Sequence, residues 1–197
     1  MIENKRVDFL IQALKNIGKD SRESYSTDNS CAAVLLPIVI GDGKCDLLFT
    51  KRTANVASHQ NEVSFPGGSY EKDDVSMEAT ALRETYEEIG LEGNQIQIIG
   101  HLPVSNTVTG FSVFPFVGLV KFPYNLKINR HEVEKVFTIP IDWLENPDNF
   151  YEADYHSEKF GVRKVIHYKD YEGEHLWGYT ARLTQQLLEL LNKKDNG

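Results

Sequence analysis

Residues 67–91 read GGSYEKDDVSMEATALRETYEEIGL, in which a glycine pair and an acidic turn precede a segment with helical periodicity. Apolar residues recur there every three or four positions, which predicts an amphipathic helix over 76–89. Ser76 is suited to cap its N-terminus, and Gly90 is suited to end it. The side chains predicted to face the core are Ala79, Leu82, Tyr86 and Ile89.

Three glutamates share one face of this predicted helix. Glu84, Glu87 and Glu88 stand at positions i, i+3 and i+4, where like charges repel and destabilise an isolated helix. They also lie near the C-terminal end, where the helix dipole disfavours negative charge. A hard divalent cation such as Mg²⁺ would neutralise the cluster, because carboxylate oxygens are among its preferred ligands. A solvent-exposed acidic face is the alternative interpretation.

The neighbouring residues favour a metal or phosphate site over a merely acidic helix. Arg83 is placed to pin a carboxylate through a two-point ion pair. The pair Gly67-Gly68 lets the backbone approach a phosphate or a metal ion closely. Asp73 and Asp74 are predicted to add oxygen ligands near the start of the helix.

Apolar runs on either side of this block predict strands mixed with helices. Residues 32–40 predict a buried strand and 46–50 a second one, and the turn residues between them indicate a hairpin. Further strands are predicted over 62–65, 96–99, 114–120 and 136–139, and further helices over 4–17 and 180–191. This order predicts an α+β domain with a mixed sheet over 31–197, preceded by a helix and a linker in 1–30.

The composition is that of an ordinary globular protein. Of the 197 residues, 41% are hydrophobic and 25% charged, which excludes collagen-like and largely disordered chains. The net charge is −8, so we expect no binding to nucleic acid or to an anionic membrane. Cys31 and Cys45 have no CxxC partner, and no segment approaches the roughly 20 apolar residues of a membrane helix. Without a signal-peptide pattern, we expect a cytoplasmic protein.

Residues 68–91 resemble the signature of the Nudix family, G-x5-E-x7-R-E-U-x-E-E-x-G-U, where U is aliphatic. The second half matches from Arg83 to Leu91, with Thr85 at an aliphatic position. In the first half, Asp74 stands where the signature has glutamate, and one residue is inserted before Arg83. The resemblance implies a Nudix-like α/β/α sandwich with a mixed β-sheet, and hydrolysis of a nucleoside diphosphate linked to another group.

The segment before the signature is similar to that of coenzyme A pyrophosphatases. Their pattern H-x-G-x-V-x-F-P-G-G is matched by residues 59–68, with Asn61 in place of the first glycine. The inserted residue and Asp74 also occur in this subgroup. The resemblance implies cleavage of coenzyme A or its thioesters to 3′-phosphoadenosine 5′-phosphate and 4′-phosphopantetheine or its acyl form. Hydrolysis of ADP-ribose or of a dinucleotide, and a catalytically silent nucleotide-binding domain, are the alternatives.

The same resemblance implies a cofactor and its ligands. Mg²⁺ or Mn²⁺ is the expected cofactor, and a small-molecule nucleotide diphosphate is the expected partner. The expected metal ligands are Glu84, Glu87, Glu88 and the backbone of Gly68. The oligomeric state is open, and a homodimer is one alternative.

Catalytic and substrate-binding roles are also implied. Arg83 is expected to orient the catalytic carboxylates. The general base is open between Glu84 or Glu87 in the signature and Glu132 on a later segment. Arg52 and His59 are expected to contact the substrate.

Overall fold

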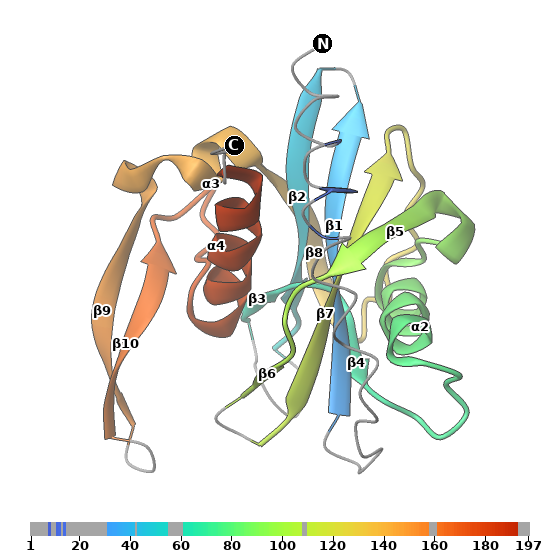
Figure 1. Ribbon diagram of the computed structural model, residues 1–197, viewed down its shortest axis with the longest axis horizontal. Helices are drawn as coiled ribbons and strands as arrows, with labels where there is room; N and C mark the ends of the chain where they lie inside the picture. The colour runs from blue at the N-terminus through green and yellow to red at the C-terminus, as the bar shows by residue number, and fades with distance from the viewer. Residues whose placement is uncertain are drawn as a thin grey trace.

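An eight-stranded mixed sheet forms the centre of the protein, with helices on both of its faces (Figure 1). The computed structural model describes residues 8, 11, 12, 14, 31–41, 43–54, 61–107, 110–157 and 161–192. Its strands are β1 (Cys31–Gly41), β2 (Lys44–Arg52), β3 (Val63–Ser64), β4 (Gly67–Ser69), β5 (Ile96–His101), β6 (Ser105–Asn106), β7 (Ser112–Lys121), β8 (Val133–Pro140), β9 (Phe150–Ser157) and β10 (Gly161–Tyr168). Its helices are α2 (Met77–Ile89), α3 (Ile141–Glu145) and α4 (Gly178–Asn192), with 3₁₀ turns η1 (Gly93–Gln95) and η2 (Pro147–Asn149).

The longest strand, β1, runs through the middle of the sheet. Its residues 38–41 pair antiparallel with residues 44–47 of β2, so the predicted hairpin is confirmed. On its other side, residues 31–40 pair in parallel with residues 112–121 of β7. A parallel pair within an otherwise antiparallel sheet makes the sheet mixed, as predicted.

Beyond the hairpin, the sheet opens between β1 and β2. There β3 pairs with the end of β2, while residues 67–69 of β4 pair with residues 32–34 of β1. The amide of Leu35 donates to the carbonyl of Pro66 at 2.9 Å, which fixes the chain between the two strands. The glycine pair is therefore wedged into the opening, where β4 packs against α2.

Two hydrophobic clusters fill the two faces of the sheet. Successive residues of a strand point to opposite faces, so Leu35 and Leu48 enter the cluster on the α2 side, while Leu36 and Phe49 enter the other. In Figure 1, α2 (green) lies on one side of the sheet, and α4 (red) with the hairpin β9–β10 (orange) lies on the other. The predicted α+β class is confirmed.

Helix α2 begins and ends as predicted, but its buried face overlaps the predicted one only in part: Ile89 is buried and Leu82 packs against the core. The Oγ of Ser76 accepts the amide of Ala79 at 3.1 Å, and Gly90 ends the helix with a φ of 71°. The buried residues of α2 are Thr80, Ala81, Thr85, Glu88 and Ile89. Tyr86, which was predicted to face the core, is 56% exposed. That prediction is wrong because polar side chains take core-facing positions, which a hydrophobic periodicity cannot reveal.

Thr85, one of the two buried threonines of α2, is compatible with a core because its hydroxyl is satisfied. The Oγ1 of Thr85 donates to the carbonyl of Ala81, one turn earlier, at 2.7 Å. A buried hydroxyl without a partner would cost free energy, whereas this local bond removes most of that penalty. Thr85 therefore replaces the aliphatic residue of the Nudix signature without leaving a buried polar atom unpaired.

The sequence pattern does not predict the hairpin β9–β10. Most of its side chains are exposed or half-buried, so the alternation of apolar and polar residues is weak. Aromatic stacking stabilises it instead. The ring of His167 lies 5.5 Å from that of Tyr151 and 5.6 Å from that of Trp177, with interplanar angles of 14° and 13°. These contacts join residues that are distant in sequence and leave no local pattern.

Part of the predicted N-terminal segment is seen. Residues 8, 11, 12 and 14 are helical, within the helix predicted over 4–17, and Leu14 is fully buried in the cluster on the α4 side. The rest of that predicted helix, the linker before residue 31 and His59 lie outside the described residues. In the part of the chain that the structure describes, no helix has the length and apolarity to cross a membrane.

Candidate active site

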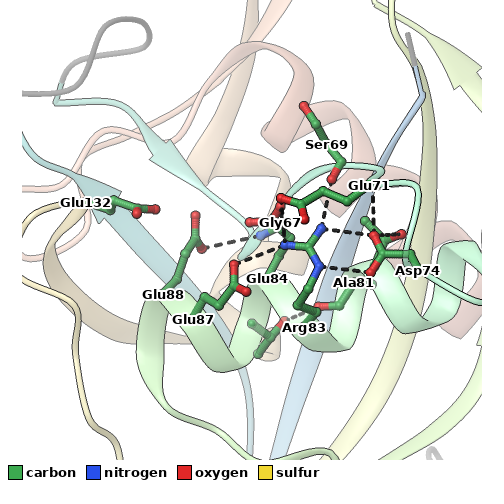
Figure 2. A network of polar contacts seen from close by, with 12 residues as sticks. Gly67, Ser69, Glu71, Asp74, Ala81, Arg83, Glu84, Glu87, Glu88 and Glu132 are labelled. Atoms are coloured by element: carbon green, nitrogen blue, oxygen red, sulfur yellow. Dashed lines mark hydrogen bonds and ion pairs between the residues drawn. The ribbon is translucent and has the colours of Figure 1, made fainter. Parts of the chain in front are cut away.

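Arg83 is the hub of a polar network that joins α2 to the turn before it (Figure 2). Its Nε and Nη2 donate to the two carboxylate oxygens of Asp74 at 2.9 and 3.0 Å. Nη2 also donates to the carbonyl oxygen of Ser69 at 3.0 Å. Nη1 donates to Glu84 at 3.1 Å and to Glu87 at 3.0 Å. One guanidinium therefore orients the carboxylates of Asp74, Glu84 and Glu87.

The carboxylate of Asp74 is fully engaged in this network. Its Oδ2 also accepts the amide of Glu71 at 3.0 Å and the hydroxyl of Thr80 at 2.8 Å. Hydrogen bonding to Arg83 is the main cause that lowers the pKa of Asp74 to about 2. The pKa of Arg83 is raised in turn, chiefly by its bonds to Asp74. Its oxygens accept four hydrogen bonds in all, so the structure places Asp74 in the network of Arg83, and its expected role as a further metal ligand stays a prediction.

Glu84 lies directly against the glycine pair. A Cβ atom at position 68 would come within 2.5 Å of the carboxyl carbon of Glu84, so any larger residue at Gly68 would have to displace that carboxylate. Burial raises the pKa of Glu84, while the charge of Arg83 lowers it. Because glycine has no side chain, the backbone of Gly68 lies in contact with the half-buried carboxylate of Glu84.

Glu88 is the most deeply buried of the three signature glutamates. Its side chain is 3% exposed, against 16% for Glu84 and 50% for Glu87. Its Oε2 accepts the amide of Gly67 at 3.3 Å, and its Oε1 lies 3.5 Å from Nη1 of Arg52. Burial raises the pKa of Glu88 to about 8, outweighing the lowering by Arg52 and Gly67. A buried carboxylate whose charge is only partly balanced by its neighbours is typical of a functional site.

Arg52 reaches Glu88 from the end of β2. Its Nε is buried and has no hydrogen-bond partner among the described residues. An unsatisfied buried donor costs about 1–3 kcal/mol. An anionic group bound beside Glu88 would satisfy this donor and neutralise the guanidinium.

Glu132 comes from a distant loop and faces the same carboxylates. It lies in the turn before β8, and Figure 2 shows its side chain beside Glu88. Its charge raises the pKa of both Glu84 and Glu88. The structure therefore brings Glu132 together with two of the signature glutamates, while Glu87 lies nearer the surface.

The donor set fits a hard divalent cation. Glu84 and Glu88 offer carboxylate oxygens, and Gly68 has its backbone against Glu84. As the side chains stand, no three acidic, histidine or cysteine residues within the described ranges form a closed metal cage. Mg²⁺ does not need such a cage, because it binds through one or two carboxylates together with water and phosphate oxygens.

Asn129 and Thr53 belong to the site but are not revealed by the sequence. The amide of Asn129 donates to the carbonyl of Glu88 at 2.9 Å, and the amide of Thr53 donates to the carbonyl of Glu132 at 2.9 Å. Neither residue is part of a motif. A lone asparagine or threonine in a loop carries no functional signal until its partners are known.

Comparison with known sequences identifies the family. A profile of the NUDIX domain matches residues 30–159, which is most of the chain and includes every site residue named above. The chain belongs to the Nudix family, as its signature predicted.

Individual relatives support this assignment along nearly the full length. A protein of Yersinia enterocolitica named "Uncharacterized Nudix hydrolase NudL" is 34% identical over 169 residues, which cover 86% of this chain and 85% of the relative. "Nudix hydrolase 3" of Caenorhabditis elegans is 38% identical over 184 residues, covering 86% of this chain and 76% of the relative.

Solved structures share the fold. A MutT/nudix family protein from Enterococcus faecalis aligns with a TM-score of 0.51 at 15% identity, covering 96% of this chain and 79% of the other. The Nudix hydrolase RenU from M. smegmatis aligns with a TM-score of 0.50 at 18% identity, covering 58% of this chain and 72% of the other. At such identities the likeness concerns the fold alone.

Proposed function

We propose that the protein hydrolyses the diphosphate bond of coenzyme A or of its thioesters, with Mg²⁺ or Mn²⁺ as cofactor. The observation that carries a hydrolytic role is the convergence of Glu84, Glu88 and Glu132 beside the glycine pair. Family membership supports a substrate in which a nucleoside diphosphate is linked to another group. The similarity of residues 59–68 to coenzyme A pyrophosphatases supports the finer choice.

Glu84 and Glu88 are the proposed principal metal ligands. Glu87 and the carbonyl of Gly68 are the proposed additional ones. A bound divalent cation supplies an activated water and neutralises phosphate oxygens. The pKa of Glu88 is raised to about 8 even beside Arg52, so a further positive charge such as a bound cation would favour its ionised form.

Glu132 is the proposed general base. Glu84 and Glu87 are both held by hydrogen bonds from the guanidinium of Arg83, whereas the carboxylate of Glu132 accepts one side-chain bond among the described residues, from Asn129, and so has acceptor sites left for a water. In the proposed step, Glu132 takes a proton from water as the water oxygen bonds to one phosphorus. The bridging P–O bond breaks, and the bridging oxygen leaves with the other phosphate. The products are therefore two phosphomonoesters.

Arg52 is the proposed contact for the substrate diphosphate. Its guanidinium is held by Glu88 at one nitrogen, while the buried Nε has no partner in the described part of the protein. A phosphate oxygen is a strong acceptor for such a donor. His59 keeps its expected role as a second substrate contact.

Product analysis by chromatography tests the proposal. The purified protein is incubated with Mg²⁺ or Mn²⁺ and, separately, with coenzyme A, ADP-ribose and a diadenosine polyphosphate. Chelator-sensitive release of 3′-phosphoadenosine 5′-phosphate from coenzyme A would support it. Preferential cleavage of another substrate would overturn the coenzyme A assignment but keep the hydrolytic chemistry. Cleavage of none would favour a catalytically silent domain.

A matched pair of variants links any activity to this site. Glu88→Gln removes the charge of the buried carboxylate with little change in shape, and we expect turnover to fall by roughly a hundredfold or more. Glu78→Gln makes the same change on the exposed first turn of α2 and should leave turnover unaltered. Equal turnover of the two variants would contradict the assignment of the site.

A further inference from the structure

We propose that Asn129 is a positioning residue, which holds the carboxylate of Glu132 against the glutamates of α2. The inference rests on the proposed function, in which Glu132 is the general base. It concerns a residue outside the Nudix signature, in the loop between β7 and β8.

The contacts of Asn129 connect the base to the helix directly. Its side-chain Nδ2 donates to Oε1 of Glu132 at 3.3 Å, and its Oδ1 accepts the amide of His131 at 3.1 Å. Its own amide donates to the carbonyl of Glu88 at 2.9 Å. A single residue therefore binds the base through its side chain and the last turn of α2 through its backbone.

The turn around Glu132 is held independently of the Asn129 side chain. The carbonyl of Asn129 accepts the amides of Glu132 at 3.1 Å and Val133 at 2.9 Å. From the other side, Thr53 donates its amide to the carbonyl of Glu132 at 2.9 Å and its hydroxyl to the carbonyl of His131 at 3.0 Å. A change limited to the Asn129 side chain should therefore leave the backbone of the turn in place.

Only an amide side chain satisfies both side-chain contacts of Asn129. Its NH₂ group donates to a carboxylate while its oxygen accepts from a backbone amide. An aspartate has the same size and keeps the acceptor for the His131 amide, but it has no donor for Glu132. It would also bring a negative charge against Glu132 and turn the base away by repulsion.

Asn129→Asp is the test, with Asn125→Asp as its matched control. Asn125 is exposed and lines one surface cleft together with Asn129, and no hydrogen bond or ion pair of its side chain is seen among the described residues, so the control adds the same charge without removing a bond to Glu132. For Asn129→Asp we expect kcat to fall about tenfold or more and KM to change by less than about threefold, because a displaced base weakens chemistry rather than binding. The control should keep both parameters within about twofold of the parent protein. Equal kcat for the two variants would overturn the inference.

Glu132→Gln separates a failure of this inference from a failure of the proposed function. If Glu132→Gln keeps the parent turnover, Glu132 is not the base and the proposed mechanism is wrong. If Glu132→Gln loses turnover while Asn129→Asp retains it, the positioning role alone is wrong. If both lose turnover, the double variant decides: Asn129→Asp should have little further effect on the Glu132→Gln protein. An equal loss in that background would show that Asn129 does not act through Glu132.

Discussion

Arg83 and Asp74 form a two-point ion pair, with Nε to Oδ1 at 2.9 Å and Nη2 to Oδ2 at 3.0 Å, that links the middle of α2 to the turn before it (Figure 2). The inserted residue of the signature lies between these two side chains in the sequence. The shorter aspartate and the longer spacing still yield a side chain that orients Arg83. The departure from the signature is therefore compatible with an intact network.

Replacement of Asp74 by asparagine should destabilise the protein in a pH-dependent way. The pKa of Asp74 is lowered to about 2, so its stabilising ionised form is present above pH 4 and is lost as the pH falls towards 2. With a side chain only 6% exposed, the ion pair should contribute about 2 kcal/mol to the free energy of unfolding at pH 7. Urea denaturation of Asp74→Asn should show this loss at pH 7, and the gap to the parent protein should close near pH 2.

Asp73→Asn is the matched control for that measurement. Asp73 is the exposed neighbour of Asp74, so Asp73→Asn makes the same chemical change at the protein surface. If Asp73→Asn were as destabilising as Asp74→Asn at pH 7, the ion pair with Arg83 would not be the cause.

The two adjacent glycines should respond differently to alanine. At Gly67, with a φ of 153°, a Cβ would lie 2.3 Å from the backbone carbonyl oxygen of Ala33, which cannot move without breaking the sheet. We expect Gly67→Ala to lower the free energy of unfolding by roughly 2–4 kcal/mol. At Gly68 the obstacle is the carboxylate of Glu84, the end of a flexible side chain. Gly68→Ala should therefore fold but lose about tenfold or more in turnover.

Thermal denaturation and steady-state kinetics on both variants check this prediction. Gly93→Ala is the control, because the nearest atom to its added Cβ would be 3.9 Å away. A stable and fully active Gly68→Ala protein would mean that the position of Glu84 is unimportant for turnover.

Glu88→Gln should stabilise the protein at alkaline pH when divalent ions are removed by a chelator. The folded protein raises the pKa of Glu88 from 4.5 to about 8, so the folded state binds an extra proton between these values. The contribution of Glu88 to the free energy of unfolding of the parent protein is therefore most favourable below pH 4.5, and it is lost as the pH rises from 4.5 through 8. Glutamine has no charge to bury. Between pH 5 and pH 9 the free energy of unfolding of the variant should therefore rise by roughly 2–4 kcal/mol relative to that of the parent protein. Parallel stability curves of the two proteins would contradict this account.

Added Mg²⁺ or Mn²⁺ should raise the melting temperature of the parent protein. A cation that binds only the folded state stabilises it by about 2.7 kcal/mol at a hundredfold excess over its Kd. The shift should be larger at pH 8 than at pH 6, because the metal competes with the proton on Glu88. Differential scanning fluorimetry should show the shift in Glu78→Gln but not in Glu88→Gln. An undiminished shift in Glu88→Gln would place the cation elsewhere.

Local features of the chain were predictable because their causes are local. The cap by Ser76, the left-handed stop at Gly90 and the spacing of the three signature glutamates each depend on residues within one or two helical turns. The β1–β2 hairpin was likewise indicated by two apolar runs and a glycine turn. The Nudix family and the α+β class followed from these features.

The helix, its acidic face and the glycine pair beside it thus follow from the order of the residues alone. Tertiary structure decided which carboxylate is buried and what meets it. Glu88 and Glu87 are neighbours in a helix, yet one side chain is 3% exposed and the other 50%. That difference, and with it the raised pKa of Glu88, arises because β1 and β4 cover one side of α2, while Gly67 of β4 and Arg52 at the end of β2 reach Glu88. The approach of Glu132 is also fixed only by chain folding, since its hydrogen bonds run to a loop asparagine and to the end of β2. Burial and long-range contacts depend on where distant segments pack, and no local pattern of residues encodes them.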